Sequence, residues 1–187
     1  QSLPKLRQYR DKKLAVVGTP CQIYSIRCMQ GLGVMPSGNV EYCLGLFCYE
    51  NFAFDDARKR QFEKEFGISF EEIQKINIKE KLILTLKDGT SLKIELDDLG
   101  DYIRPACRAC RDFTNVYADI SFGGLGSPEK FTTILTRTDK GRDLVLKAMK
   151  AKVLECNRLG YDEKKSMKEL IADYTRSKTR RKKAFLG

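Results

Sequence analysis

Cysteines are the residues of this sequence best suited to carry out chemistry. Seven occur among 187 residues, and four lie near predicted strand ends or in loops, beside small or turn-forming residues: Cys21, Cys48, Cys107 and Cys110. Cys107 and Cys110 form a C-x-x-C pair, a spacing at which a tight turn points two sulfur atoms the same way. Four thiolates from three separate loops suit a tetrahedral zinc ion or a [4Fe–4S] cluster. The spacing alone also allows thiols that bind no metal, or a dithiol redox pair.

The other three cysteines are weaker candidates for a metal site. Cys28 falls on the helix predicted after Cys21 and is expected to be packed. Cys43 lies in the middle of a predicted strand, and Cys156 lies close to the basic C-terminal tail. We interpret each of them as a core or surface thiol.

The residue types that are missing exclude several classes of site. The chain has no His, which excludes imidazole bases, Ser-His-Asp triads, His-bearing zinc sites and His-ligated haem. No apolar run reaches the ~18 residues of a membrane span, so no transmembrane segment is predicted. The chain begins with Gln1 and a polar, basic stretch, which indicates a processed chain or a fragment and not a signal peptide. An odd number of cysteines without such a signal favours the reducing cytoplasm.

The positive charge is concentrated near the C-terminus. The formal net charge is +10, and residues 158–187 hold ten Lys and Arg against four Asp and Glu. Six basic residues cluster there: Arg176, Lys178, Arg180, Arg181, Lys182 and Lys183. We expect a solvated, partly disordered tail, with docking to an acidic partner as the alternative. The run lacks interleaved aromatic residues, so nucleic-acid binding is not predicted.

The hydrophobic pattern predicts an α/β (α+β) fold: a mixed sheet with flanking helices and Cys-bearing loops. Asp88-Gly89 is the strongest hairpin signal in the chain. In the predicted helix at 139–150, the residues expected to face inward are Leu144, Val145, Ala148 and Met149. The predicted strands cover residues 14–18, 40–47, 81–87, 91–96, 119–122 and 132–137, and the other predicted helices cover 22–29, 55–66, 70–75 and 164–178.

A glycine-rich turn follows the strand predicted at 119–122. Gly123, Gly124 and Gly126 would let the backbone approach a ligand closely, and free amides in such a turn can bind phosphates. The segment matches neither the P-loop pattern nor the dinucleotide-binding G-x-G-x-x-G pattern. A turn without a ligand is the other interpretation.

Three segments together resemble the coenzyme F-420 hydrogenase/dehydrogenase beta-subunit family. They are GTPCQ at 18–22, GLFCYENF at 45–52, and CRACRDFTNVYADISFGGLGSPEKFTTILTRTDKG at 107–141. The resemblance runs in order over about residues 10–155. It implies that residues 1–157 are the C-terminal iron–sulfur and flavin domain of such a subunit. Residues 158–187 would then be a basic helical extension, and the family's N-terminal part would be missing.

The resemblance also implies cofactors, a substrate and a partner. The cofactors are FAD and a [4Fe–4S] cluster, the substrate is the deazaflavin coenzyme F-420, and the partner is a catalytic hydrogenase or formate dehydrogenase subunit. The implied cluster ligands are Cys21, Cys48, Cys107 and Cys110. The residues implied near the flavin are Gly123, Gly124, Gly126, Ser127, Pro128, Arg137 and Thr138. Lys130-Phe131 departs from the family, whose members tend to have Gly-Trp there.

Two alternatives to this electron-transfer subunit stay open at the level of sequence. The first is a four-cysteine zinc module whose basic tail binds an acidic partner or nucleic acid. The second is a ferredoxin-linked flavoprotein reductase that acts on another substrate.

Overall fold

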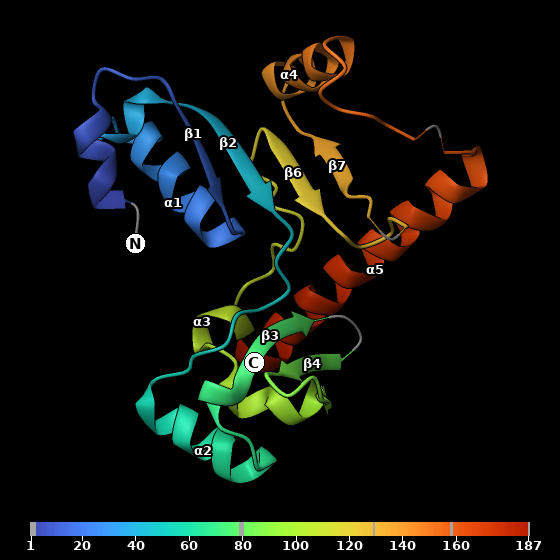
Figure 1. Ribbon diagram of the computed structural model, residues 1–187. Coiled ribbons are helices and arrows are strands. Elements are labelled where there is room, and N and C mark those ends of the chain that lie inside the picture. Colours follow the sequence, from blue (N-terminus) through green and yellow to red (C-terminus); the bar gives the residue numbers. More distant parts are fainter. Residues whose placement is uncertain (1–2, 79–80, 129, 158, 187) are drawn as a thin grey trace. The chain divides into compact units, whose positions relative to one another are not determined.

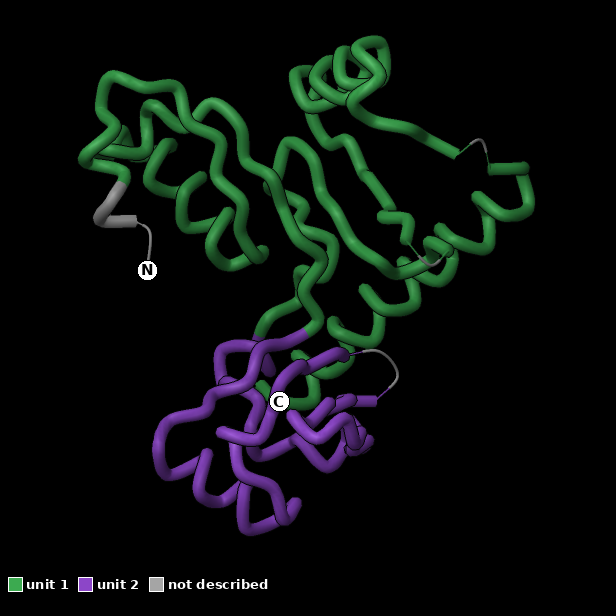
Figure 2. The backbone as a smooth tube through the Cα atoms, in the orientation of Figure 1, with its two compact units in different colours: residues 1–49, 110–187 green, residues 50–109 purple. Residues whose placement is uncertain are grey.

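The computed structural model describes residues 3–78, 81–128, 130–157 and 159–186, and the chain forms two compact units. The first unit contains residues 1–49 and 110–187, and the second contains residues 50–109 (Figure 2). The second unit is therefore an insertion in the sequence of the first. Neither boundary coincides with the division at residue 157 expected from the sequence. The α/β class with a mixed sheet is confirmed.

The sheet of the first unit has four strands in the order β1-β2-β6-β7 (Figure 1). Their bounds are Leu14–Gly18 for β1, Val40–Leu46 for β2, Ile120–Gly123 for β6 and Thr133–Thr136 for β7. β2 pairs in parallel with both β1 and β6, whereas β7 runs antiparallel to β6. The carboxyl ends of β1, β2 and β6 therefore lie at one edge of the sheet, where open α/β sheets bind ligands.

Three α-helices belong to the first unit: α1 (Pro20–Gly31), α4 (Asp139–Lys150) and α5 (Tyr161–Leu186). Two short 3-10 helices, η1 (Leu3–Tyr9) and η2 (Ser37–Asn39), complete it. All three predicted helices are confirmed, but α1 begins two residues earlier than expected and α5 extends further at both ends. Within the described residues, no helix has both the length and the apolar character that crossing a bilayer requires.

Local sequence explains where these helices begin. Pro20 occupies the first turn of α1, and Gln22 Oε1 accepts a hydrogen bond of 2.9 Å from the Thr19 amide. The Thr138 hydroxyl accepts a hydrogen bond from the Gly141 amide and caps α4. The inward face predicted for α4 is only partly right, because Met149 is 40% exposed. The core beneath the sheet is formed by Leu6, Ile23, Ile26, Val40, Cys43 and Ala118.

The second unit packs one helix against a three-stranded antiparallel sheet in the order β3-β4-β5. Its strands are β3 (Ile73–Ile78), β4 (Lys81–Leu86) and β5 (Ser91–Glu95), and its helices are α2 (Asp56–Phe66), α3 (Pro105–Arg108) and the 3-10 helices η3 (Phe70–Glu72) and η4 (Asp97–Tyr102). The predicted hairpin at Asp88-Gly89 is confirmed, and Gly89 has a φ of 87°. α2 also ends as predicted, at Gly67 with a φ of 66°.

The helix predicted at 70–75 is wrong. A single 3-10 turn, capped at Ser69, covers residues 70–72, and the chain then enters β3. The β-branched residues Ile73, Ile76 and Ile78 favour a strand, and this strand pairs antiparallel with β4 over most of its length, with one irregularity between Ile73 and Lys75.

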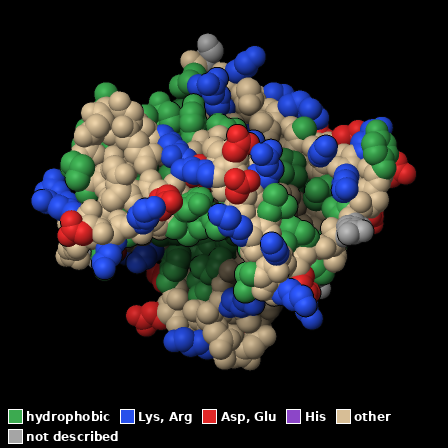
Figure 3. Space-filling view, turned by 90° about the horizontal axis from the view of Figure 1, so that it is seen from above, with side chains coloured by type: hydrophobic (Ala, Val, Ile, Leu, Met, Phe, Trp, Pro, Cys, Tyr) green, Lys and Arg blue, Asp and Glu red, His purple; other side chains and the backbone are tan. Residues whose placement is uncertain are grey.

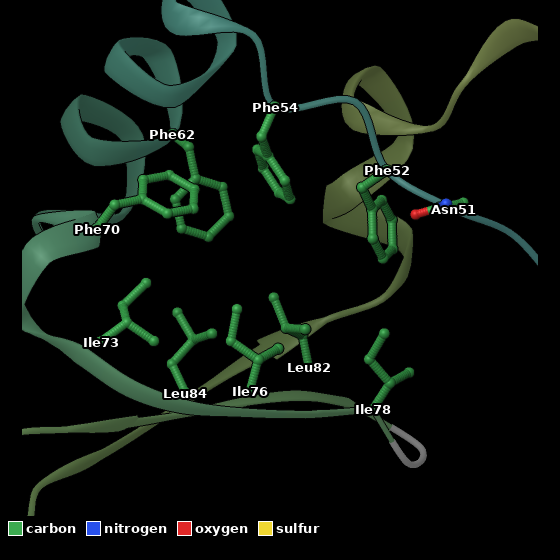
Figure 4. Close-up of a pocket in the computed structure, with 10 residues that line it drawn as sticks. All are labelled: Asn51, Phe52, Phe54, Phe62, Phe70, Ile73, Ile76, Ile78, Leu82 and Leu84. Atoms are coloured by element: carbon green, nitrogen blue, oxygen red, sulfur yellow. The ribbon is translucent and has the colours of Figure 1, made fainter. Parts of the chain in front are cut away.

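An apolar cavity of about 140 Å³ lies between α2 and this sheet (Figure 4). Phe52, Phe54, Phe62 and Phe70 line it from one side, and aliphatic residues of β3 and β4 face them from the other. The cavity belongs to the core of the second unit, where Phe62 is almost fully buried.

Lys and Arg side chains are dispersed over the face shown in Figure 3 and do not merge into one continuous patch. Lys178, from the basic cluster of the tail, is buried. The expectation of a wholly solvated tail is therefore wrong at this residue.

Asp119 is a fully buried carboxylate that joins three elements of the first unit. Its oxygens accept hydrogen bonds from the Cys43 amide at 2.8 Å and the Thr138 hydroxyl at 2.9 Å. Arg27 and Lys140 form ion pairs with it at 3.0 and 3.3 Å. Burial alone would raise the pKa of Asp119, but these hydrogen bonds and cations outweigh burial and lower it.

Replacing this carboxylate should destabilise the fold in a pH-dependent way. We expect Asp119→Asn to lower the free energy of unfolding by about 1–3 kcal/mol at pH 7, as for a buried group that loses its partners. Because the folded-state pKa is lowered, the stabilisation is present above the unfolded pKa of ~3.9 and is lost as pH falls through the folded value. Urea unfolding at pH 7 and pH 3 measures both effects.

Asp139→Asn is the matched control, because Asp139 is a surface residue whose side chain is 89% exposed in its ion pair with Arg142. It should leave stability nearly unchanged at both pH values. An Asp119→Asn variant that differs from the natural chain equally at pH 7 and pH 3 would contradict the role assigned to the carboxylate.

Candidate functional site

The carboxyl edge of the main sheet carries two of the predicted cysteines. β1 ends at Gly18 and Cys21 lies in the first turn of α1, while Cys48 follows the end of β2 by two residues (Figure 1). The Thr19 hydroxyl lies 3.3 Å from the sulfur of Cys21, which is exposed. Cys48 is half-buried. Both thiols thus sit where parallel strands place ligand-binding groups.

The segment after Cys110 is hydrogen-bonded to the same edge. The amide of Cys48 donates to the carbonyl of Phe113 at 2.9 Å. The Asp112 carboxylate accepts hydrogen bonds from the amides of Asn115 and Val116, at 2.8 and 3.0 Å, and shapes the segment into a tight turn. The backbone at Cys48 is therefore fixed directly to the backbone just beyond Cys110.

Asn115 fastens this turn to two strands at once. Its side chain is fully buried, and its Nδ2 donates to the carbonyls of Gly18 at 2.9 Å and Leu46 at 3.4 Å. Its φ of 61° is a left-handed conformation that Asn tolerates better than most residues. Gly45 makes room for it, because a Cβ at residue 45 would lie 2.4 Å from Asn115 Cγ.

Sequence reasoning missed Asn115. It lies in the family-like segment at 107–141, and nothing in its immediate neighbours predicts that it reaches the ends of two strands.

The other two predicted ligands lie on either side of the boundary between the units. Cys107 is in α3 of the second unit and Cys110 belongs to the first, and both are half-buried. All seven cysteines are among the described residues, and none forms a disulfide. In the described part of the chain, no group of three or more Cys, Asp or Glu side chains is arranged to hold a metal ion. The ligand set stays a prediction.

Of the remaining cysteines, one is buried and two are exposed. Cys43 is buried in the core of the first unit, and burial raises the pKa of its thiol. Cys156 is exposed. Cys28 is also exposed, so the expectation that it is packed is wrong.

The glycine turn after β6 borders a cavity of about 490 Å³. Ser127 and Pro128 line it together with Lys130, Phe131 and residues of the 154–159 segment. The Ser127 and Thr133 hydroxyls lie 2.7 Å apart and hold the turn closed over the start of β7. This volume falls in the range of ~300–1,000 Å³ that is usual for ligand pockets.

The three glycines of this turn differ in what surrounds them. A Cβ at Gly123 would lie 2.0 Å from the ring of Phe47, and one at Gly126 would lie 2.5 Å from Met167. Gly126 also has a φ of 81°. A Cβ at Gly124 would meet nothing within 4 Å. Packing therefore explains Gly123 and Gly126, and leaves Gly124 open for a ligand.

Arg137 and Thr138, also predicted near the flavin, have partners within the protein. Arg137 donates to the carbonyl and the hydroxyl of Thr114, at 3.2 and 2.6 Å. Burial lowers the pKa of Arg137, and the nearby Asp112 carboxylate opposes that shift. Thr138 caps α4 and donates to Asp119. Arg137 thus braces the 110–115 turn, and Thr138 braces the sheet.

Comparison with known proteins places these features in a family. Residues 11–160 match the family model described as the C terminus of the coenzyme F-420 hydrogenase/dehydrogenase beta subunit. The coenzyme F-420 hydrogenase subunit beta of Methanococcus voltae is 36% identical over 155 residues, covering 80% of this chain and 54% of that protein. The coenzyme F-420-dependent sulfite reductase of Methanocaldococcus jannaschii is 34% identical over 157 residues, covering 76% of this chain and 25% of that protein. The chain thus spans about half or less of these curated relatives.

A solved structure has a similar fold. A chain of the F-420-reducing [NiFe] hydrogenase complex from Methanosarcina barkeri superposes with a TM-score of 0.74 at 25% sequence identity. The match covers 97% of this chain and 68% of that one, so it includes both compact units.

The close fit of Asn115 against Gly45 can be tested with a double-mutant cycle. Gly45→Ala should lower the free energy of unfolding by about 1–3 kcal/mol, because the new methyl group overlaps the Asn115 side chain. Asn115→Gly keeps the left-handed backbone but removes the hydrogen bonds, with a similar cost. The double variant should be more stable than the sum of the two losses predicts, because the overlap with Asn115 is gone.

Chemical denaturation of the four proteins gives the coupling free energy. Gly31→Ala is the control, because a Cβ there meets nothing within 4 Å. Strict additivity of the two substitutions would show that the close approach does not constrain the turn.

Proposed function

The chain belongs to the coenzyme F-420 hydrogenase/dehydrogenase beta-subunit family, and we propose that it carries a [4Fe–4S] cluster and part of a flavin site that serve electron transfer. The observation that supports this most is the carboxyl edge of the main sheet. There the backbone of Cys48 is hydrogen-bonded to the turn that follows Cys110, and Cys21 lies in the first turn of the helix after the neighbouring strand.

The donor set fits an iron–sulfur cluster in its chemistry. Cys21, Cys48, Cys107 and Cys110 are thiols, the ligands that such clusters use most. Three of them belong to the first unit, and the C-x-x-C spacing ties Cys107 to Cys110. The turn at 110–115 and the start of α1 would hold their backbones in place when the cluster is bound.

The cavity beside the glycine turn fits part of a flavin. Its volume suits a planar ring system, and Lys130 supplies a positive charge at its wall. Gly124, which lies a few residues before the cavity lining begins at Ser127, leaves the main chain accessible. Phe131 lines the cavity at the position where the family tends to have Trp, so an aromatic side chain is kept there.

The two cofactors would divide the chemistry between them. The residues around the cavity would hold FAD, which would supply hydride exchange with the deazaflavin coenzyme F-420, and the cysteines would hold a [4Fe–4S] cluster, which would supply one-electron transfer. This chemistry needs no general base from the protein, so the absence of His is compatible with it. The protein's own groups position the cofactors, exclude water and supply hydrogen bonds and charges around them.

The proposed substrate and partner are suggested by the names of the relatives. One is the beta subunit of a coenzyme F-420 hydrogenase, and another is a coenzyme F-420-dependent sulfite reductase. We infer that the protein containing this chain uses coenzyme F-420 and delivers electrons to, or accepts them from, a catalytic subunit of the hydrogenase or formate dehydrogenase kind.

Iron analysis tests the cluster. After anaerobic reconstitution the chain should hold about four iron and four sulfide, with an EPR signal on reduction by dithionite. Cys21→Ser, Cys48→Ser, Cys107→Ser and Cys110→Ser should each lower the iron content by at least about half, because a serine oxygen is a poor cluster ligand. Iron and sulfide assays with EPR measure the loss.

Cys28→Ser is the matched control, because Cys28 lies on the same helix as Cys21 and is exposed. Full iron content in a Cys107→Ser variant would remove Cys107 from the ligand set. Zinc that persists through reconstitution without an EPR signal would favour the zinc module. Flavin bleaching by ferredoxin but not by reduced coenzyme F-420 would favour a reductase with another substrate.

Substitutions at two glycines distinguish a role in flavin binding from a role in packing. Gly124→Ala should weaken FAD binding at least about tenfold, because the added methyl group would keep the ligand from the main chain, and leave the melting temperature unchanged. Gly123→Ala should instead lower the free energy of unfolding by about 1–3 kcal/mol, because its methyl group overlaps Phe47. Flavin fluorescence titration and thermal unfolding of the same samples measure both. Unchanged FAD affinity in Gly124→Ala would exclude Gly124 from the flavin site.

A further inference from the structure

The C-terminal helix α5 lies beyond the residues that the family model matches. The model covers 11–160, and α5 begins at Tyr161. This helix nevertheless contacts the two segments that carry Cys48 and Cys110. The Tyr174 ring stacks on Phe113 at 5.6 Å, and the Ser177 hydroxyl lies 3.0 Å from that of Tyr49.

Lys178 makes the closest of these contacts. Its side chain is 1% exposed, and its Nζ donates to the carbonyls of Cys48 at 2.6 Å and Asp112 at 2.7 Å. One ammonium group therefore bridges the loop after β2 and the turn after Cys110. One turn further along α5, Arg181 stacks on the Tyr49 ring at 4.6 Å and donates to the Tyr49 carbonyl at 3.0 Å.

The partners of Lys178 do not neutralise its charge. Both are main-chain carbonyls, and among the ion pairs of the described residues none includes Lys178. Burying a cation is costly unless an anion compensates it. A cluster bound by four thiolates has a net negative charge, which increases when the cluster is reduced. A buried ammonium against the Cys48 carbonyl would stabilise that charge.

We propose that Lys178 is a positioning residue for the iron–sulfur site, which holds the Cys48 and Cys110 segments together and raises the reduction potential of the bound cluster. The inference rests on the proposed function. The positive charge favours the reduced cluster because that state carries one more negative charge. The same two hydrogen bonds fix the separation of the two segments before any cluster is bound.

Two substitutions at this residue separate charge from hydrogen bonding. Lys178→Arg keeps both the charge and donor groups, whereas Lys178→Gln keeps donor groups and removes the charge. We expect the equilibrium constant for reduction to fall about tenfold or more in Lys178→Gln, because a unit charge beside the backbone of Cys48 would interact strongly with the cluster in a buried site. A tenfold change is about 59 mV for one electron. Lys178→Arg should stay near the natural potential. Lys183→Met, which removes an exposed charge from the same helix, should leave the potential unchanged.

The measurements are EPR-monitored redox titration and iron content of the reconstituted full chain, with thermal unfolding of the apo chain alongside. A lower potential in Lys178→Gln than in Lys178→Arg supports the proposal, and so does loss of iron in the Gln variant alone. Equal potentials in the two variants, equal loss of iron in both, or loss in the Arg variant alone would overturn it. A natural chain that binds no iron would instead overturn the proposed function, which keeps the two failures distinct.

Discussion

The structure of the candidate site depends on which groups donate hydrogen bonds to the backbone carbonyls at the ends of β1 and β2. Parallel strands that stop at a sheet edge leave carbonyl groups without ladder partners, and buried carbonyls need donors. Asn115 supplies one amide group to both strands, through Gly18 and Leu46, and Gly45 leaves the space that its side chain fills. The turn at 110–115 therefore cannot move without breaking hydrogen bonds at two strand ends. Arg137 and Asp112 brace the same turn from other sides.

Among the described residues of the first unit, Asp119 and Lys178 carry buried charges, and these are compensated in opposite ways. Asp119 meets two cations and two hydrogen-bond donors, so its charge is balanced within the protein. Its role is complete without any ligand, because it joins α1, β2 and α4. Lys178 donates to two main-chain carbonyls, which orient its side chain but do not neutralise its charge. The first arrangement is typical of a group that stabilises a fold, and the second suits a group that awaits an anion.

Local signals carried most of the sequence-based prediction. Gly67 and Asp88-Gly89 set a helix end and a hairpin through their own backbone preferences, and those elements are confirmed. The prediction failed at 70–75, where a helix was expected and pairing with the next strand along the chain produces a strand instead. Asn115 and Lys178 could not be predicted, since their carbonyl partners lie as far as 97 and 130 residues away along the chain. A run of basic residues looks the same in the sequence whether all of its lysines are exposed or one of them is buried.

Residues 50–109, which form the second unit, are inserted between two points of the first unit. The chain leaves the first unit at Tyr49 and returns at Cys110, and those two points are held together by the bond from the Cys48 amide to the Phe113 carbonyl and by Lys178. The ends of the insertion are therefore fixed within the first unit, independently of what is inserted. Those hydrogen bonds hold the backbone at Cys48 and just after Cys110, whereas Cys107 lies inside the insertion. In the proposed four-thiolate site, Cys107 would be positioned by its short covalent link to Cys110, so the C-x-x-C spacing would matter more to this residue than any contact of the sheet.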